Sequence, residues 1–422
     1  MMTQSNVVES CTLLRVVMAL MGISNEFRVF ICGKTFIVIN IKESREDIKP
    51  FVFDCSTVEK QPSGNKKEGE DELTEEKGSN DILAFSFSAS GKYFALTDDN
   101  KRLFLFSTKP SWQCLCVRSV VRRCCSLTIT HFEDQILVAD KSGDVYAFSI
   151  TEPQKQAELK LGHLSMLLKV VVDPSDKYII TADRDEKIRI SFLKTPYNIE
   201  SFCLGHREFV SALLVIPKHP HLLLSGSGDG TLRLWQYKSG KEVQQWNLRD
   251  LTGTDLIDKN KKFSVSKISV SPTEGFIAIL CDSFPFIHLF QMDQKSEQLM
   301  YKEMIRLEHN CWDVAFDDSG RLWTFLQTET AVVTLYQLKN GHWQHIEEDQ
   351  DLKMARNVLS NYWKLLKESL GTESQYSNLY KAVFDNMASY LEKKDKLLIE
   401  KKERKRKGQM LTSSSSNKQL RN

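Results

Sequence analysis

The amino-acid sequence predicts an all-β fold, in which similar sheets are stacked around a ring as a β-propeller. The first observation is a repeated phrase: Leu161-Gly162-His163 recurs as Leu204-Gly205-His206, 43 positions further along the chain. The second is that a polar turn and an alternating apolar strand follow each copy, which is the pattern of a half-buried β-strand. The third is that such strands recur along most of the chain at nearly constant spacing, as propeller blades do.

The strand that follows each polar turn gives the number of blades. Neighbouring copies begin 42 to 55 residues apart, at Leu103, Val145, Ile188, Leu232, Ile287 and Val333. Residues 51–54 fit as the first copy, so we expect seven blades, which are enough to close a ring and protect the sheet edges. Around the copy at Leu232, the pattern predicts an inner strand over 209–216 and further strands over 222–227 and 231–237.

One copy carries the residue set of a WD repeat. His206 stands upstream of Ser225 and Asp229, and the strand that follows them ends in Trp235. In the WD repeats that this copy resembles, these four residue types form one buried hydrogen-bonded set. Such a set acts as a unit, because a buried carboxylate is costly unless hydrogen-bond donors surround it.

The preceding copy has a similar set. We expect His163, Thr181 and Asp185 to play the same parts there, with Ser191 in place of the tryptophan. Histidines in this context are interpreted as structural residues, not catalytic ones. The predicted fold is therefore a seven-bladed WD-repeat β-propeller with a C-terminal helical basic tail.

Composition divides the chain into the ring and its appendages. Residues 26–350 are expected to form the propeller, interrupted by a polar, charged and disordered insert over 56–80. Residues 1–25 are expected to be a poorly ordered N-terminal extension. Apolar residues at helical spacing predict a helical basic tail over 351–408, followed by a disordered C-terminus over 409–422.

The tail ends in a strongly basic run over residues 401–407. One interpretation is the solvated end of a helix. The other is a nuclear import signal or a phosphate-binding arm, and both of these uses point to the nucleus and to nucleic acid.

Residue patterns exclude several classes of function. The ten cysteines have irregular spacing and no Cys-x-x-Cys pair, which argues against a metal site and for a reducing, intracellular compartment. No apolar stretch is long enough to span a membrane. Gly226, Gly228 and Gly230 imitate a nucleotide-binding loop, but no helix follows them to meet a phosphate. We therefore expect no catalytic residues and no cofactor, and interpret the chain as a protein that is not an enzyme by itself.

Charged residues are expected to gather on one face of the ring. The repeat period places a basic group, Lys101, Arg122, Arg123 and Lys141, on the same side as the mixed turn of Arg184, Asp185, Glu186 and Lys187. The basic group suits contacts with a nucleic-acid backbone. The mixed turn is better suited to fixing the register of a protein partner than to binding RNA. Ordinary solvated loop charge is an alternative for both.

Longer strings identify a family. Residues 141–146, 161–168, 181–189, 201–206 and 379–386 closely resemble the WD-repeat, non-catalytic subunits of vertebrate tRNA (guanine-N7-)-methyltransferase. The resemblance extends from about residue 29 to residue 391 and does not cover residues 1–25 or 56–80.

The resemblance implies that methyl transfer belongs to a separate subunit, which binds S-adenosylmethionine and forms a heterodimer with this chain. It implies that the catalytic subunit docks on the turn that contains Asp185 and Glu186, and that Arg189 belongs to the same ion-pair network. Arg189 is alternatively a structural residue held by Glu186. The family's tRNA footprint implies tRNA contacts at Arg122, Arg123 and Lys141.

The predicted function is therefore that of a nuclear, non-catalytic scaffold, which stabilises the methyltransferase partner and helps to position tRNA for formation of N7-methylguanosine. The alternative is a substrate receptor of a nuclear cullin–RING ubiquitin ligase, a role that WD propellers also perform.

Overall fold

A computed structural model describes residues 19–42, 49–58, 78–253 and 261–371, together with residues 374, 376–381, 387, 390, 391, 393–397 and 399. The chain divides into a compact unit of residues 1–380 and a second unit of residues 381–422. In the second unit, residues 387, 390, 391, 393–397 and 399 are helical. The basic run over 401–407, most of the predicted insert and the predicted C-terminus lie outside the described residues.

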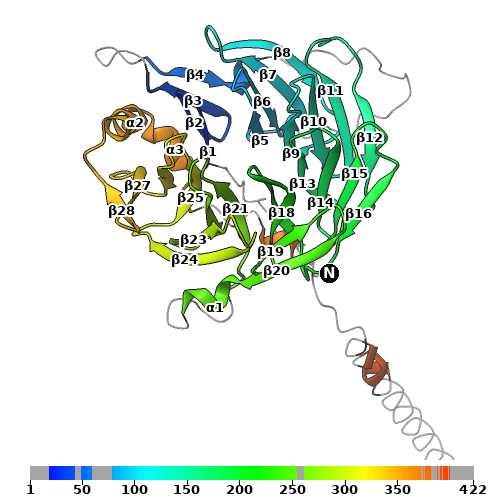
Figure 1. The fold of residues 1–422 in the computed structure, drawn as a ribbon. Helices are drawn as coiled ribbons and strands as arrows, with labels where there is room; N and C mark the ends of the chain where they lie inside the picture. The colour runs from blue at the N-terminus through cyan, green and yellow to red at the C-terminus, as the bar shows by residue number, and fades with distance from the viewer. Residues whose placement is uncertain are drawn as a thin grey trace, which may run out of the picture. The chain divides into compact units, whose positions relative to one another are not determined.

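The first unit is a ring of seven four-stranded sheets, as the repeat predicts (Figure 1). Blade 1 contains β1 (Ala19–Ser24), β2 (Phe27–Cys32), β3 (Thr35–Asn40) and β4 (Phe51–Asp54). Blade 2 contains β5 (Ile82–Phe87), β6 (Tyr93–Asp98), β7 (Arg102–Ser107) and β8 (Gln113–Ser119). Blade 3 contains β9 (Cys124–Ile129), β10 (Gln135–Asp140), β11 (Asp144–Ser149) and β12 (Glu158–Gly162). Blade 4 contains β13 (Leu167–Val172), β14 (Tyr178–Asp183), β15 (Ile188–Phe192) and β16 (Ile199–Cys203).

Blade 5 contains β17 (Val210–Ile216), β18 (His219–Ser227), β19 (Thr231–Gln236) and β20 (Lys241–Asn247). Blade 6 contains β21 (Val265–Val270), β22 (Phe276–Cys281), β23 (Phe286–Met292) and β24 (Leu299–Arg306). Blade 7 contains β25 (Cys311–Phe316), β26 (Leu322–Leu326), β27 (Val333–Lys339) and β28 (His342–Ile346). The helical elements are η1 (Cys55–Thr57), α1 (Leu248–Thr252), α2 (Gln350–Asn361), α3 (Trp363–Leu366), η3 (Lys367–Ser369) and η4 (Ser377–Leu379).

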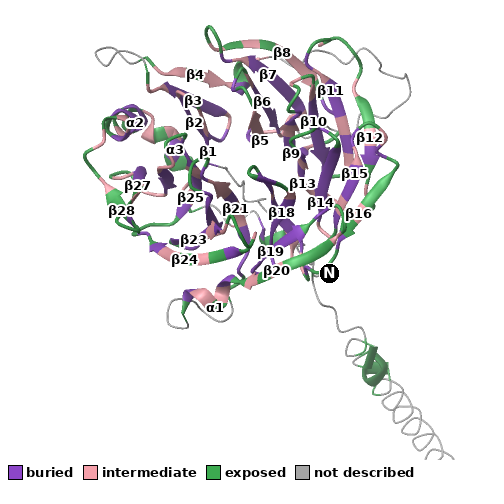
Figure 2. Ribbon diagram, viewed as in Figure 1, coloured by how far each residue is buried: buried purple, intermediate pink, exposed green. Residues whose placement is uncertain are grey.

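The core lies between neighbouring blades. Phe36 of blade 1, for example, meets the rings of Phe94 and Phe106 of blade 2 at 5.4 and 5.2 Å between centroids. The outermost strands β12, β16 and β20 have long exposed stretches, whereas the strands inside them are mostly buried (Figure 2). Successive side chains of a strand point to opposite faces of its blade, and each face packs against a neighbouring blade. Apolar burial between the blades therefore holds the ring together.

The six clear predicted copies all lie in the third strand of a blade, but the prediction for blade 1 was wrong. Residues 51–54 form β4, the outermost strand, and the third strand is β3. β3 contains four consecutive apolar residues at 36–39, so its sequence lacks an alternating polar residue such as Arg233 in β19. Residues 19–24, assigned to the N-terminal extension, form β1. This strand belongs to the ring, because the Met21 amide donates to Asp313 Oδ2 of blade 7 at 2.9 Å.

Helices α2 and α3 belong to the propeller unit, which corrects the predicted boundary at residue 351. Leu352 and Leu359 of α2 and Leu366 of α3 are buried in one core cluster with Phe30 of blade 1 and Phe325 of blade 7. Each sheet consists of consecutive strands, so none of the described strands is exchanged between blades 1 and 7. Side chains of these two blades and of the two helices fill the seam instead.

An ionic cluster lies at the same seam. Arg321 of blade 7 donates to Asp317, Asp349 and Asp351 at 2.8, 2.8 and 2.9 Å. Asp349 also caps α2, because its side chain accepts a hydrogen bond from the Leu352 amide. The first turn of α2 is thereby fixed to blade 7.

Candidate partner interface

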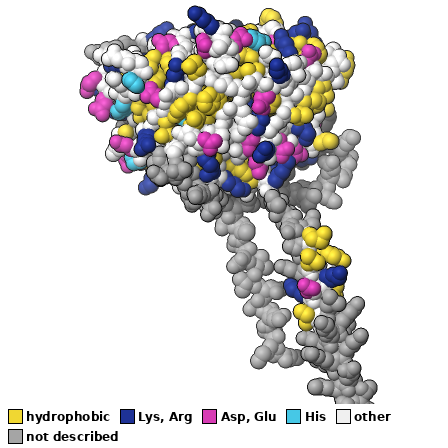
Figure 3. All heavy atoms as spheres, turned by 60° about the horizontal axis from the view of Figure 1, so that its bottom comes forward, with side chains coloured by type: hydrophobic (Ala, Val, Ile, Leu, Met, Phe, Trp, Pro, Cys, Tyr) yellow, Lys and Arg dark blue, Asp and Glu magenta, His cyan; other side chains and the backbone are white. Residues whose placement is uncertain are grey.

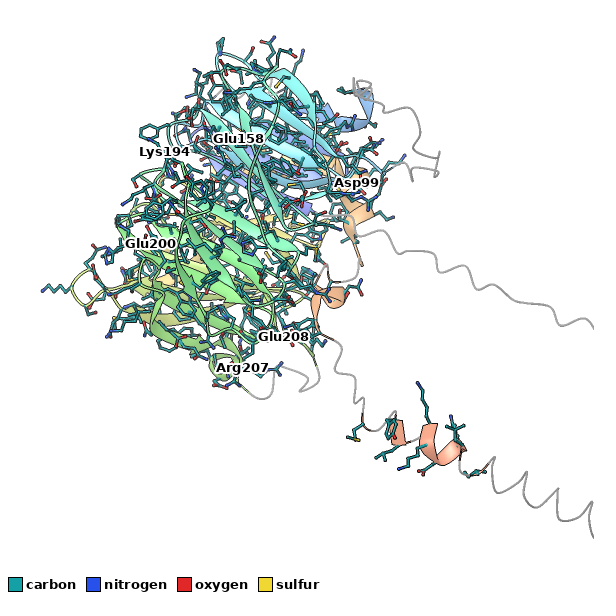
Figure 4. All side chains as sticks on the ribbon, turned by 90° about the vertical axis from the view of Figure 1, so that its right-hand side faces the viewer. Asp99, Glu158, Lys194, Glu200, Arg207 and Glu208 are labelled. Atoms are coloured by element: carbon teal, nitrogen blue, oxygen red, sulfur yellow. The ribbon has the colours of Figure 1, made fainter. Side chains whose placement is uncertain are left out.

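Four consecutive blades present the same kind of turn on one face of the ring. We call it the loop face: it carries the turns between second and third strands and the connections between blades. In blades 2 to 5, the third residue after the second strand has a positive φ; these residues are Lys101 at 62°, Gly143 at 100°, Glu186 at 67° and Gly230 at 76°. Asp99 and Glu208 lie towards this face, and Lys194 and Glu200 towards the opposite one (Figure 4).

The predicted WD set of blade 5 is formed. His206 Nδ1 lies 3.1 Å from Asp229 Oδ2, and His206 Nε2 lies 2.7 Å from Ser225 Oγ. Trp235 Nε1 donates to the same Ser225 oxygen at 2.8 Å. Burial opposes ionisation of Asp229, but hydrogen bonds from His206, Thr231 and Arg207 outweigh it and hold the pKa of this carboxyl well below its usual range. The set therefore contains a stable buried carboxylate.

In blade 4 the set contains a different aspartate from the one predicted. His163 Nε2 lies 2.8 Å from Thr181 Oγ1, as expected, but His163 Nδ1 lies 3.0 Å from Asp183 Oδ2, not from Asp185. Asp183 also accepts a hydrogen bond from the Lys187 amide at 3.0 Å. Asp183 is the last residue of β14, whereas Asp185 lies two residues later in the turn, at the position that Asp229 occupies in blade 5. The two blades therefore bind their histidine through aspartates at different positions.

The basic residues of blades 2 and 3 are brought together through the connection between these blades. The Val120 amide donates to the Lys101 carbonyl at 2.9 Å, and the Lys141 amide donates to the Arg123 carbonyl at 3.1 Å. Arg123 Nε also donates to the Asp99 carbonyl at 3.2 Å. With Arg122 exposed beside them, Lys101, Arg123 and Lys141 form the predicted basic arc on the loop face.

The mixed turn of blade 4 adjoins this arc, and its arginine has an intramolecular partner that the sequence did not indicate. Arg184 Nε donates to the Leu379 carbonyl at 3.1 Å. The segment around Leu379 is itself anchored, because Tyr376 stacks on Phe209 at 5.7 Å and Lys262 lies 3.8 Å from the centroid of the Tyr380 ring. No local pattern could reveal a contact between residues 195 positions apart.

The other residues of this turn remain on the loop face. Lys187 is exposed, and Asp185 and Glu186 are half-buried. A turn that mixes both signs of charge in so few residues is suited to fixing the register of a complementary protein surface.

Arg189 does not show the ion pair expected for it. Its guanidinium donates to Ser191 Oγ, the Gly162 carbonyl and the Pro196 carbonyl at 2.9, 3.1 and 3.0 Å, all neutral acceptors. Burial lowers its pKa. Arg189 therefore ties β15 to the end of β12 in the neighbouring blade, which is a structural role within the ring.

The described part of the chain contains no group of three or more His, Cys, Asp or Glu side chains that could hold a metal ion. Burial raises the pKa of the Cys124 thiol to about 12 and that of the Cys125 thiol to about 11, so both are protonated at neutral pH. Among the described helices, none is long and apolar enough to cross a membrane.

Comparisons with known proteins agree with the fold and indicate a family. The family model of the tRNA methyltransferase TRM82 WD40 domain matches residues 41–160 and 149–354. The tRNA (guanine-N(7)-)-methyltransferase non-catalytic subunit wdr4 of Danio rerio is 52% identical over 380 residues, which cover 88% of this chain and 91% of that protein. The subunit WDR4 of Homo sapiens is 49% identical over 363 residues, with 86% of each chain covered.

Solved structures show the same architecture at low sequence identity. The chain in "Structure of U3-55K" matches with a TM-score of 0.58 and 16% identity, covering 80% of this chain and 94% of that one. The RRP9 WD40 repeats match with a TM-score of 0.58 and 17% identity, covering 80% and 93%. Likeness of this kind shows a WD40 propeller and nothing about function.

Proposed function

Since the chain belongs to the family of the tRNA methyltransferase TRM82 WD40 domain, we propose that it is the non-catalytic subunit of a tRNA (guanine-N7-)-methyltransferase and pairs with a separate catalytic subunit. The observation that carries this proposal is the 52% identity over 380 residues to a relative with that name. The relatives are named non-catalytic, so this chain is not the enzyme that transfers the methyl group.

We assign the loop face to docking of the catalytic subunit. In this proposal Asp185, Glu186 and Lys187 set the register of the partner, while Arg184 holds the Leu379 segment beside them. The rigid turns support this role, because a surface that is ordered before binding loses less conformational entropy when the partner docks. The chain would stabilise the partner by adding this fixed surface to it.

In the complex, the basic arc would add to the surface that binds tRNA. Lys101, Arg122, Arg123 and Lys141 provide four positive charges next to the mixed turn. Contacts of this kind with phosphates position a nucleic acid without reading its sequence. Holding the target guanine near the methyl donor lowers the barrier by orientation alone.

We place S-adenosylmethionine on the catalytic subunit and the complex in the nucleus. The basic run over 401–407 supports the second assignment, because such runs act as nuclear import signals. This chain would contribute binding surface and orientation, and the partner's cofactor would supply the methyl group.

Co-purification tests the pairing. The wild-type chain and a variant with Asp185→Lys and Glu186→Lys are each mixed with the purified catalytic subunit and run on gel filtration. We expect a one-to-one complex with the wild type and a much weaker one with the variant. Failure of the wild-type chain to bind, or recovery of a ubiquitin-ligase adaptor in its place from cells, would contradict the proposal.

A further inference from the structure

Among the described residues of the propeller unit, Leu164 is the most exposed large apolar side chain, with a relative exposure of 110%. It lies between β12 and β13, on the connection between blades 3 and 4. Single exposed apolar residues are ordinary on protein surfaces, and the rim turned forward in Figure 3 also shows apolar patches among charged side chains. Exposure alone therefore says little about Leu164.

The backbone that carries Leu164 is held on both sides. The preceding His163 is bound at both ring nitrogens, by Asp183 and Thr181, and its amide donates to the Gly143 carbonyl at 2.8 Å. Two residues after Leu164, the Met166 carbonyl accepts a hydrogen bond from the Arg184 amide at 2.9 Å.

The connection also rests directly on the turn of blade 3. Gly143 has a φ of 100°, and a Cβ atom added there would lie 2.5 Å from the His163 carbonyl oxygen and 2.7 Å from that of Ser165. Only glycine allows this approach. Leu164 is thus presented to solvent by a loop that cannot fold back to bury it.

The surroundings of Leu164 match the anatomy of a protein–protein contact. Lys141 of the turn beneath it and the mixed turn of blade 4 beside it supply charged neighbours. One repeat earlier, Val121 occupies the corresponding loop position and is 56% exposed. Apolar anchors inside a charged rim, on a rigid surface, are the usual centres of binding energy.

We propose that Leu164, assisted by Val121, is the apolar anchor that inserts into a pocket of the catalytic subunit. The inference rests on the proposed function and deepens it by naming the residue at the centre of the interface. The occupant is a protein surface and not tRNA, because an aliphatic side chain offers neither charge to a phosphate nor an aromatic ring to a base.

The test measures the dissociation constant between the full chain and its purified catalytic subunit by titration calorimetry. Leu164→Asp should weaken binding at least 30-fold, the effect of losing a hot spot, and Val121→Asp should weaken it less. Because both side chains point into solvent, the melting temperatures of the variants should equal that of the wild type. Leu164→Ala provides a milder second variant and should also weaken binding.

Phe132→Asp is the matched control. Phe132 is 78% exposed on the turn between β9 and β10, at the opposite edge of blade 3, and Asp176 fixes that turn by accepting from the Phe132 amide at 2.7 Å. This variant should bind as the wild type does. If the wild type binds and Leu164→Asp binds equally well, the anchor is refuted while the proposed function stands. If Leu164→Asp weakens tRNA binding by the isolated chain and leaves the heterodimer intact, Leu164 contacts tRNA and the assignment of a protein partner to it is wrong.

Discussion

His163 and Asp183 form a buried pair, 3.0 Å apart between Nδ1 and Oδ2, which joins the connection between blades 3 and 4 to the turn of blade 4. Their side chains are only 5% and 3% exposed. The pair fixes both the loop that presents Leu164 and the turn assigned to partner docking. Stability of the ring and geometry of the proposed interface therefore depend on the same contact.

Removal of Asp183 should destabilise the protein strongly. Asp183→Ala leaves His163 Nδ1 and the Lys187 amide without their acceptor, and breaking such a buried pair costs about 3 kcal/mol. The free energy of unfolding from urea titration checks this. Asp185→Ala is the matched control, because Asp185 does not bind His163, and it should cost less than Asp183→Ala. Equal losses in the two variants would contradict the assignment of Asp183 to the buried set.

The helices at the seam should be essential for closing the ring. A chain that ends at residue 349 lacks Leu352, Leu359 and Leu366, and each large buried side chain contributes about 2–5 kcal/mol. We expect a large drop in the urea midpoint and exposure of apolar surface, measured by dye binding. A chain that ends at residue 381 retains the helices and should unfold at the wild-type midpoint. Equal midpoints for the two truncations would contradict the role given to the seam.

Stability should fall in mild acid because of one buried histidine. His288 is fully buried in blade 6, and burial lowers its pKa to about 4 from the usual 6.5. Between these values the unfolded chain binds a proton that the folded chain does not, so stability is complete above pH 6.5 and decreases towards pH 4, by about 3 kcal/mol in all. Urea titrations across this range should show a shallower decrease for His288→Gln. Parallel curves for variant and wild type would refute the assignment.

The basic arc should control affinity for tRNA and its salt dependence. Each phosphate contact contributes about 0.7–0.9 to the slope of log affinity against log salt. Replacing Lys101, Arg122 and Lys141 by glutamate should therefore weaken binding of tRNA to the heterodimer and flatten this slope by about 2–3, measured by fluorescence anisotropy. Lys194→Glu, on the opposite face, is the control. If the slope for the triple variant equals that of the wild type, the basic arc does not contact tRNA.

Sequence reasoning was accurate where the strand sequence alternates apolar with polar residues and stands next to a recognisable turn. This holds for β19 and for the set around His206, where a single aspartate stands in the turn between glycines. It failed in blade 1, because residues 29–32 of β2 and 36–39 of β3 are continuous apolar runs without polar alternation.

The sequence pattern could not predict two further details of the site. The turn of blade 4 offers both Asp183 and Asp185, and only the direction of each side chain decides which one meets His163. The contact between Arg184 and Leu379 depends on the path of the chain after α3, which repeats nothing in the blades. Contacts between residues so far apart in the sequence depend on the closed ring and not on local conformational preferences.

Reconstitution of methyl transfer tests the central claim most directly. Unmodified tRNA and S-adenosylmethionine are incubated with the catalytic subunit, with this chain, or with both, and N7-methylguanosine is measured by mass spectrometry of the nucleosides. We predict no product from this chain alone and much more product from the pair than from the catalytic subunit alone. Methylation by this chain without the partner, or equal product with and without it, would contradict the account.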